Sequence, residues 1–164
     1  MSNRKIVRRW LIFFIVSLVI SGATAIPVVT ELEFATRLMP RGTAIGDWLD
    51  QVYIVLLKQD RESPFLAYGN DWLAFAHFVL AILFIGPLKD PVRNTWVIEF
   101  GMIACALVIP YALVAGYMRG LPLWWRLIDC SFGVIGFIPL LIVRRKIDLL
   151  EEEEAAEASL NAQL

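Results

Sequence analysis

Residues 95–117 read TWVIEFGMIACALVIPYALVAGY and contain a single charged residue, Glu99. A helix needs about 20 predominantly apolar residues to cross the hydrocarbon core of a bilayer. Three further segments have a similar character, at about residues 6–25, 72–88 and 121–143. The sequence therefore predicts an all-α membrane protein whose fold is a four-transmembrane-helix bundle.

The composition indicates one bundle rather than an anchor attached to a soluble domain. Of the 164 residues, 59% are hydrophobic, whereas soluble domains are about 45–50% apolar. We treat residues 1–147 as a single transmembrane bundle and 148–164 as an acidic cytoplasmic tail. The tail either extends the fourth helix or remains disordered, and we expect it to be solvated. The net charge of −1 provides no overall field that would attract nucleic acid.

The first apolar segment has two interpretations. Basic residues precede it and it ends in Ala23-Thr24-Ala25, which is the pattern of a cleavable signal peptide. Its apolar run is long for a signal peptide, so we expect an uncleaved membrane anchor.

Three clusters of basic residues set the expected orientation, because lysine and arginine near span ends favour the cytoplasmic side. The clusters are Arg4, Lys5, Arg8 and Arg9; Lys89 and Arg93; and Arg144, Arg145 and Lys146. An arrangement with both termini in the cytoplasm places all three clusters on the same side. The long connection between the first two spans then faces outward.

This outer connection has helical signals of its own. Thr30 and Glu33 match a capping box, which predicts a short helix ending near Met39. Apolar residues recur at helical spacing over about residues 44–58, which predicts an amphipathic helix. That helix lies either on the outer membrane surface or on top of the bundle. Residues 63–70 indicate a turn before the second span, with Asp71 as its N-cap.

Ionisable residues within membrane spans are costly and usually face a bundle interior or a hydrated cavity. Four such residues are present, namely His77, Glu99, Arg126 and Asp129. At about 1.5 Å of rise per residue, three of them lie at similar depth in the outer half. We group these with two residues at the outer rim as a candidate ligand-binding cluster: His77, Arg126, Asp129, Arg119 and Asp71.

The outer cluster has three interpretations. His77 donating a hydrogen bond to Asp129 would be a satisfied polar core. Arg126 held apart from Asp129 would bind an anionic headgroup or a small solute. His77 as a general base oriented by Asp129 would make an outward-facing enzyme for a lipid-linked substrate. We expect the first.

Glu99 belongs to the cytoplasmic end of the third span. Its expected partners are Arg93 or Lys89 in the preceding turn, and Asp90 or Asn94 is the expected helix cap. We interpret Glu99, Arg93, Lys89 and Asp90 as a structural clamp at the inner hairpin. An inner gate or ligand site is the alternative.

Small residues predict where helices approach closely, because they let helix backbones come together in membranes. Gly133 and Gly136 on the last span and Gly101 and Ala104 on the third provide such surfaces. We expect no metal and no cofactor, because His77 is the only histidine and the two cysteines form no CxxC motif.

The chain resembles the VanZ-like family of small bacterial membrane proteins over about residues 70–139. The resemblance rests on Asp71 and His77 near the start of one span and on Arg126, Asp129, Gly133 and Gly136 in the last. The Asp-to-His spacing is longer here, the arginine lies closer to the aspartate, and an expected asparagine is missing. The resemblance implies a bacterial cytoplasmic membrane and an envelope or glycopeptide-tolerance context.

The sequence therefore favours a non-enzymatic envelope factor or accessory subunit. Its expected partners are the lipid bilayer and either a second copy or another membrane subunit. Binding or transport of a lipid headgroup or small solute, and catalysis on a lipid-linked substrate, are the alternatives.

Overall fold

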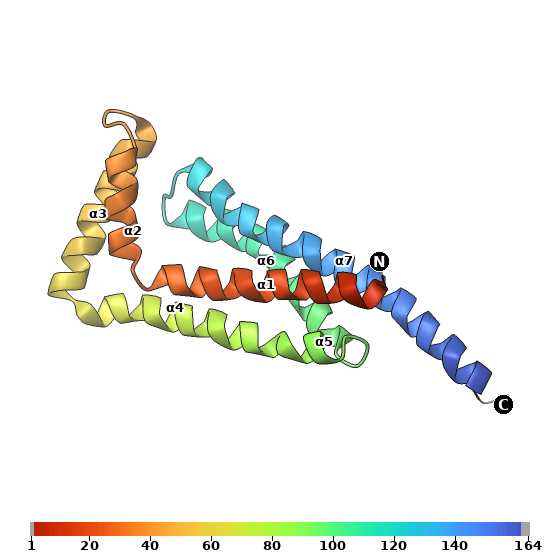
Figure 1. The fold of residues 1–164 in the computed structure, drawn as a ribbon. Helices are drawn as coiled ribbons and strands as arrows, with labels where there is room; N and C mark the ends of the chain where they lie inside the picture. The colour runs from red at the N-terminus through yellow and green to blue at the C-terminus, as the bar shows by residue number, and fades with distance from the viewer. Residues whose placement is uncertain (1, 162–164) are drawn as a thin grey trace. The chain divides into compact units, whose positions relative to one another are not determined.

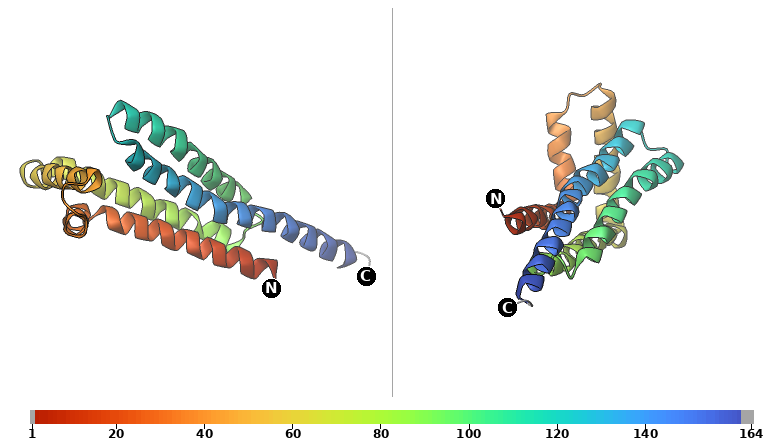
Figure 2. Two further views of the ribbon diagram at one scale, coloured as in Figure 1. Left: turned by 90° about the horizontal axis from the view of Figure 1, so that it is seen from above. Right: turned by 90° about the vertical axis from the view of Figure 1, so that its right-hand side faces the viewer.

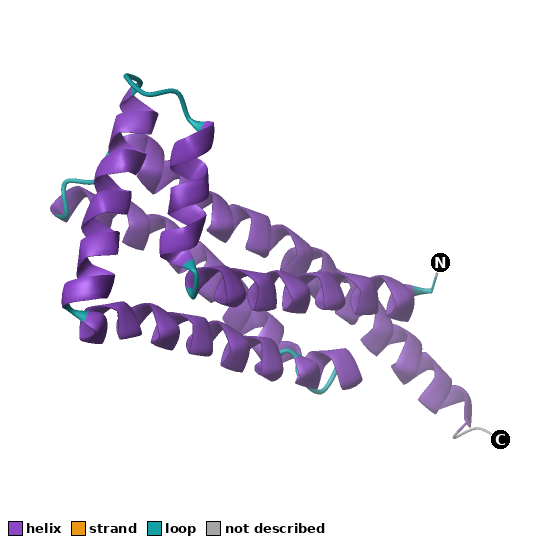
Figure 3. Ribbon diagram, turned by 60° about the vertical axis from the view of Figure 1, so that its left-hand side comes forward, coloured by secondary structure: helices purple, strands orange, loops and turns teal. Residues whose placement is uncertain are grey.

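The computed structural model describes residues 2–161, and the regular structure within them is helical, with no strand (Figure 3). Seven helices follow one another along the chain (Figure 1). They are α1 (Asn3–Ala25), α2 (Val28–Leu38), α3 (Ala44–Glu62), α4 (Pro64–Leu83), α5 (Ile85–Lys89), α6 (Thr95–Met118) and α7 (Leu123–Asn161).

Four helical segments are long and apolar enough to cross a membrane, as the sequence predicted. They are Asn3–Ala25, Pro64–Lys89, Thr95–Met118 and Leu123–Ala156. The second segment joins α4 and α5 across a single non-helical residue, Phe84. The all-helical class is confirmed for the described residues.

The chain divides into two compact units, one of residues 1–16 with 82–164 and one of residues 17–81. In the first unit α6 lies beside the N-terminal part of α7, and the rest of α7 extends beyond it (Figure 2). The largest fully buried side chains of this unit are Leu11, Phe84, Pro87, Val97, Ile98, Leu140, Val143, Ile147 and Leu150. The rings of Phe14 and Phe84, with centroids 4.7 Å apart, join α1 to the start of α5.

Glycines set the separation of α6 and α7. A Cβ atom at Gly133 would lie 2.5 Å from the carbonyl oxygen of Cys105. A Cβ atom at Gly101 would lie 2.7 Å from the ring of Phe84 and 2.8 Å from Leu140. Gly133 therefore requires glycine, because a backbone atom cannot move away, whereas an added methyl group at Gly101 would displace side-chain atoms. α6 and α7 approach each other closely at both glycines, as expected.

In the second unit α2 and α3 pack against each other as a helical hairpin. Gly42, at φ +80°, makes the turn between them, and the Thr43 hydroxyl caps α3 by accepting from the Gly46 N–H at 3.1 Å. The end of α1 approaches α4 at Gly22, where a Cβ atom would lie 2.9 Å from the Ala74 carbonyl oxygen.

Two predicted helix starts are wrong. α2 begins at Val28 after Pro27, so Thr30 lies within the helix and is not its cap. α4 begins at Pro64, where the fixed φ of proline suits a first helical position, so the expected turn at residues 63–70 is mostly helical. Asp71 consequently lies inside α4 instead of capping it.

The acidic tail continues α7 as helix to Asn161, so the extended form is the one that the described residues adopt. Near its end Glu154 pairs with Arg4 at 2.7 Å, and the Asn3 amide donates to Glu153 at 2.8 Å. These contacts tie the tail to the start of α1 within the first unit.

We expect Gly133→Ala to lower the free energy of unfolding by about 1–3 kcal/mol, the usual cost of overpacking. The added methyl group would meet the backbone oxygen of Cys105, which has no side-chain freedom to move away. Thermal unfolding followed by circular dichroism in detergent micelles measures this. Gly69→Ala is the matched control, because Gly69 is helical and open, and alanine there should be neutral or stabilising. Equal effects of the two substitutions would contradict the packing argument.

Candidate functional site

The residues of the predicted outer cluster are divided between the two units. Asp71 and His77 belong to residues 17–81, whereas Arg119, Arg126 and Asp129 belong to the other unit. The structure therefore describes the two halves of the cluster separately, and their convergence stays a prediction.

His77 is half-buried on α4 and forms a hydrogen bond within its own helix. Its Nδ1 lies 2.8 Å from the carbonyl oxygen of Leu73, one turn earlier. Because a carbonyl only accepts, Nδ1 carries the proton and donates, which leaves Nε2 as an acceptor. The Cβ atom of His77 lies against Gly22 of α1. The imidazole proton is therefore satisfied without a carboxylate.

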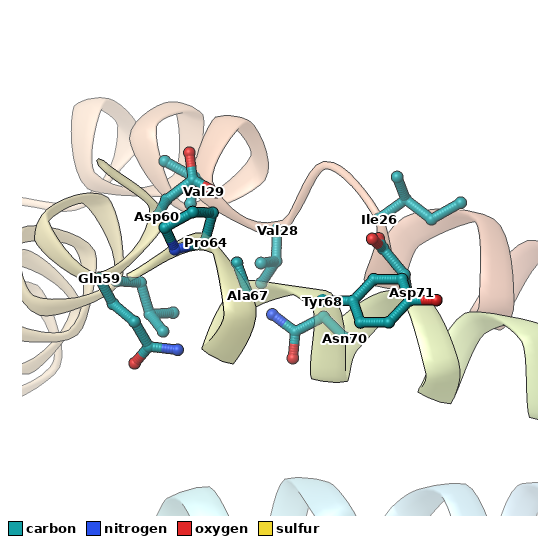
Figure 4. Close-up of a pocket in the computed structure, with 11 residues that line it drawn as sticks. Ile26, Val28, Val29, Gln59, Asp60, Pro64, Ala67, Tyr68, Asn70 and Asp71 are labelled. Atoms are coloured by element: carbon teal, nitrogen blue, oxygen red, sulfur yellow. The ribbon is translucent and has the colours of Figure 1, made fainter. Parts of the chain in front are cut away.

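Asp71 lines a cavity of about 280 Å³ within the second unit (Figure 4). The polar lining residues come from the end of α3 and the start of α4: Gln59, Asp60, Tyr68, Asn70 and Asp71. Neither the Asp60 nor the Asp71 carboxylate has a hydrogen-bond or ion-pair partner within the described residues. Gln59 and Asp60 were not among the predicted site residues, and their only signal in the sequence is their position just after the predicted amphipathic helix of residues 44–58.

Arg126 is fixed against α6. Its Cγ and Cδ atoms lie 2.5 and 2.6 Å from where a Cβ atom would be at Gly116, so the aliphatic stem fills the space that the glycine leaves. Its Nη1 donates to the Leu113 carbonyl oxygen at 3.3 Å. Its Cζ atom lies 5.9 Å from the centroid of the Tyr117 ring. The guanidinium is thus held by backbone and ring.

Two polar groups in the half of the outer cluster that belongs to the first unit have no hydrogen-bond partner in the part of the chain that the structure describes. The Arg126 Nε is buried and has no hydrogen-bond partner among the described residues. The carboxylate of Asp129, one helical turn away and half-buried, likewise has no polar partner within residues 2–161. Arg119 is exposed at the C-cap of α6. Spacing of three residues along α7 therefore does not produce an Arg126–Asp129 ion pair.

The prediction that Glu99 pairs with Arg93 or Lys89 is wrong. Glu99 Oε1 accepts from Arg144 Nε at 3.0 Å, and Arg144 also pairs with Asp148 through Nη1. Glu99 lies one turn into α6, where it reaches across to α7, and not back to Lys89 or Arg93. The network joins the cytoplasmic ends of α6 and α7 in the expected topology.

The inner hairpin is closed instead by hydrogen bonds between its own side chains and its own backbone. Asp90 Oδ1 accepts from the Arg93 N–H at 3.1 Å, and the Asn94 amide donates to the Asp90 carbonyl oxygen at 2.8 Å. The Asn94 side chain therefore braces the turn, while Asn94 itself occupies the N-cap position of α6 without a side-chain cap bond. This leaves the Lys89 and Arg93 side chains unpaired within the described residues.

A second cavity, of about 390 Å³, lies in the first unit and was not predicted. We call it the basic cleft. Its lining comes from the start of α1, the inner hairpin and the tail of α7: Arg4, Val7, Arg8, Leu88, Lys89, Asp90, Pro91, Val92, Arg93 and Glu154. The only signal in the sequence was that two of the basic clusters were expected on the same side of the membrane.

No family model, curated protein or solved structure matches this chain in the comparisons with known proteins. The likeness to the VanZ-like family therefore stays a prediction, and function is argued from the residues alone.

We expect Glu99 and Arg144 to be coupled by about 0.5–1 kcal/mol, a value typical of partly exposed ion pairs. A double-mutant cycle with Glu99→Gln and Arg144→Met, followed by thermal unfolding in micelles, measures the coupling. Arg145→Met is the control, because the neighbouring Arg145 is exposed and has no partner within the described residues. Additive effects of Glu99→Gln and Arg144→Met would contradict the pairing.

Proposed function

We propose that this chain is an integral protein of a bacterial cytoplasmic membrane, with four spans and both termini in the cytoplasm. We propose further that it acts as a non-enzymatic envelope factor or accessory subunit. The observation that carries the proposal is a continuous exposed apolar stripe along α6.

The stripe contains large side chains that are 45–79% exposed. They are Trp96, Phe100, Ile103, Leu107, Tyr111, Val114 and Met118. At about 100° per residue, they fall within roughly 80° of arc on one helix face. From Trp96 to Tyr117 the helix rises about 32 Å, which matches the roughly 30 Å hydrocarbon core. Trp96 and Tyr117 then lie at the two interfaces, where aromatic residues concentrate.

α7 adds a second exposed apolar surface. Its members are Leu127, Ile128, Phe132, Ile135 and Ile138. Exposed apolar patches on monomeric soluble proteins rarely exceed a few hundred Å², and larger ones mark membrane or partner contacts. The extent of exposed apolar surface on α6 and α7 supports contact with lipid or with helices of another subunit.

The accessory role is supported by how the ionisable residues are used. His77 bonds to the Leu73 carbonyl, Arg126 to the Leu113 carbonyl and Glu99 to Arg144. The Arg126 and Glu99 contacts join α7 to α6, and the His77 contact stays within α4, so these groups take part in the structure of the helices. In α4 the Leu73 carbonyl, rather than a carboxylate, accepts the Nδ1 proton of His77.

The topology is tested by accessibility of single cysteines. In a background with Cys105→Ala and Cys130→Ala, we expect Arg61→Cys to react with a membrane-impermeant maleimide in intact cells. We expect Arg93→Cys to react only in inverted membrane vesicles, because positive residues of short loops favour the cytoplasm. Labelling of both cysteines from the same side would contradict four spans, and labelling in the reverse pattern would contradict the orientation.

The accessory role predicts association through the exposed stripe. We expect the chain extracted in a mild detergent to migrate with another membrane subunit or as a homo-oligomer. Leu107→Asn, in the middle of the stripe, should reduce this association, whereas Leu149→Asn on the exposed tail of α7 should not. Light scattering coupled to size exclusion measures the protein mass in the complex. A clean monomer for the unaltered chain would contradict the proposal.

A further inference from the structure

We infer that the basic cleft binds a phosphate-bearing anion, and that its source is the headgroup of an anionic phospholipid in the cytoplasmic leaflet. The assignment to the leaflet rests on the proposed topology, whereas the anion site itself rests on the cleft.

The cleft holds more positive charge than its own acids neutralise. Four cationic side chains line it, from Arg4, Arg8, Lys89 and Arg93, against two carboxylates. Glu154 is engaged by Arg4 at 2.7 Å, and Asp90 accepts from the backbone N–H of Arg93 at 3.1 Å. The side chains of Arg8, Lys89 and Arg93 have no polar partner within the described residues.

The cations of the cleft come from two elements, the start of α1 and the inner hairpin. Arg4 and Arg8 are separated by one helical turn and therefore share a face of α1. The hairpin that carries Lys89 and Arg93 is held by the Asn94 amide on the Asp90 carbonyl, and the Thr95 hydroxyl donates to the Val92 carbonyl at 2.8 Å. Cations brought together from separate elements around one cavity favour an oxyanion with several acceptor atoms. Guanidinium groups bind phosphate oxygens in this way, often through two parallel hydrogen bonds.

The remaining lining fits a lipid headgroup better than a free ion. Val7, Leu88, Pro91 and Val92 supply an apolar wall beside the cations, and Val7 is buried. The cavity of about 390 Å³ is larger than a phosphate ion needs and lies within the range of small-ligand sites. Basic pockets between helices at the cytoplasmic surface are suited to anionic headgroups. A glycerophosphate would place its charge on the arginines and its glycerol carbons on the wall.

The tail of α7 makes the site adjustable. Because Glu154 already neutralises Arg4, a bound anion competes with that ion pair for the guanidinium. Removing the Glu154 charge should therefore strengthen anion binding, whereas removing cleft cations should weaken it. Opposite changes in anion affinity from the two kinds of substitution distinguish a specific site from a general loss of stability.

The test uses the full chain in uncharged detergent micelles with three probes: dioctanoyl phosphatidylglycerol, dioctanoyl phosphatidylcholine and inorganic phosphate. Binding is read from the shift in melting temperature with probe concentration. We expect phosphatidylglycerol to stabilise the protein and the other two probes to have little effect. The combined change Arg8→Gln and Arg93→Gln should weaken phosphatidylglycerol binding by at least about tenfold, and Glu154→Gln should strengthen it. Added salt should weaken binding.

Arg145→Gln is the matched control, because Arg145 is an exposed arginine of the same basic side that does not line the cleft. Lys89→Gln is a second cleft variant for use if the double variant does not fold, and it should also weaken binding. Equal weakening by Arg145→Gln, or no stabilisation by any probe, would overturn the site. Stabilisation by inorganic phosphate equal to that by the lipid would support the anion site and overturn the lipid assignment. Binding in micelles does not depend on how the chain is oriented in a membrane. The binding test can therefore contradict the anion site without contradicting the topology that the cysteine labelling tests.

Discussion

The close approach of α6 and α7 is the contact on which the first unit depends. In the proposed membrane setting, helices gain little from burying apolar side chains against one another, because lipid tails are as apolar as leucine. They gain instead from close packing of backbones, which small residues permit. Gly133 against the Cys105 carbonyl provides the tightest point of this kind along α7. A methyl group there would push the two helices apart.

Other contacts follow from the same antiparallel alignment. From the loop end inward, Arg126 fills the space over Gly116, Gly133 meets Cys105, and Leu140 meets Gly101. The last contact in the series is the ion pair of Glu99 with Arg144. Residue numbers fall along α6 as they rise along α7, so a single register accounts for all four contacts. The polar pairings are therefore consequences of the apolar packing, since a shift of one turn would separate every pair.

The helices could be predicted from the sequence because long apolar runs and helical spacing are local signals. The helix starts at Val28 and Pro64 were missed for a local reason as well: a proline suits the first turn of a helix as readily as it ends one. The partner of Glu99 was missed for a different reason. Arg144 lies 45 positions later in the chain, and only the register of two packed helices brings it there. The sequence alone favours Lys89 and Arg93 as partners of Glu99, because they are close to it in the chain.

The basic cleft illustrates the difference between orientation and recognition. In the proposed topology, orientation depends only on how many lysines and arginines flank the spans, so Arg145 counts as much as Arg8. Recognition depends on cations from separate elements surrounding one cavity, which Arg8 and Arg93 do and Arg145 does not. The sequence reveals the first property because it is a sum over residues. Recognition depends on the fold, which brings the start of α1, the inner hairpin and the tail of α7 together around one cavity. Residues that orient the chain can thus also bind an anion, at no cost to the orientation.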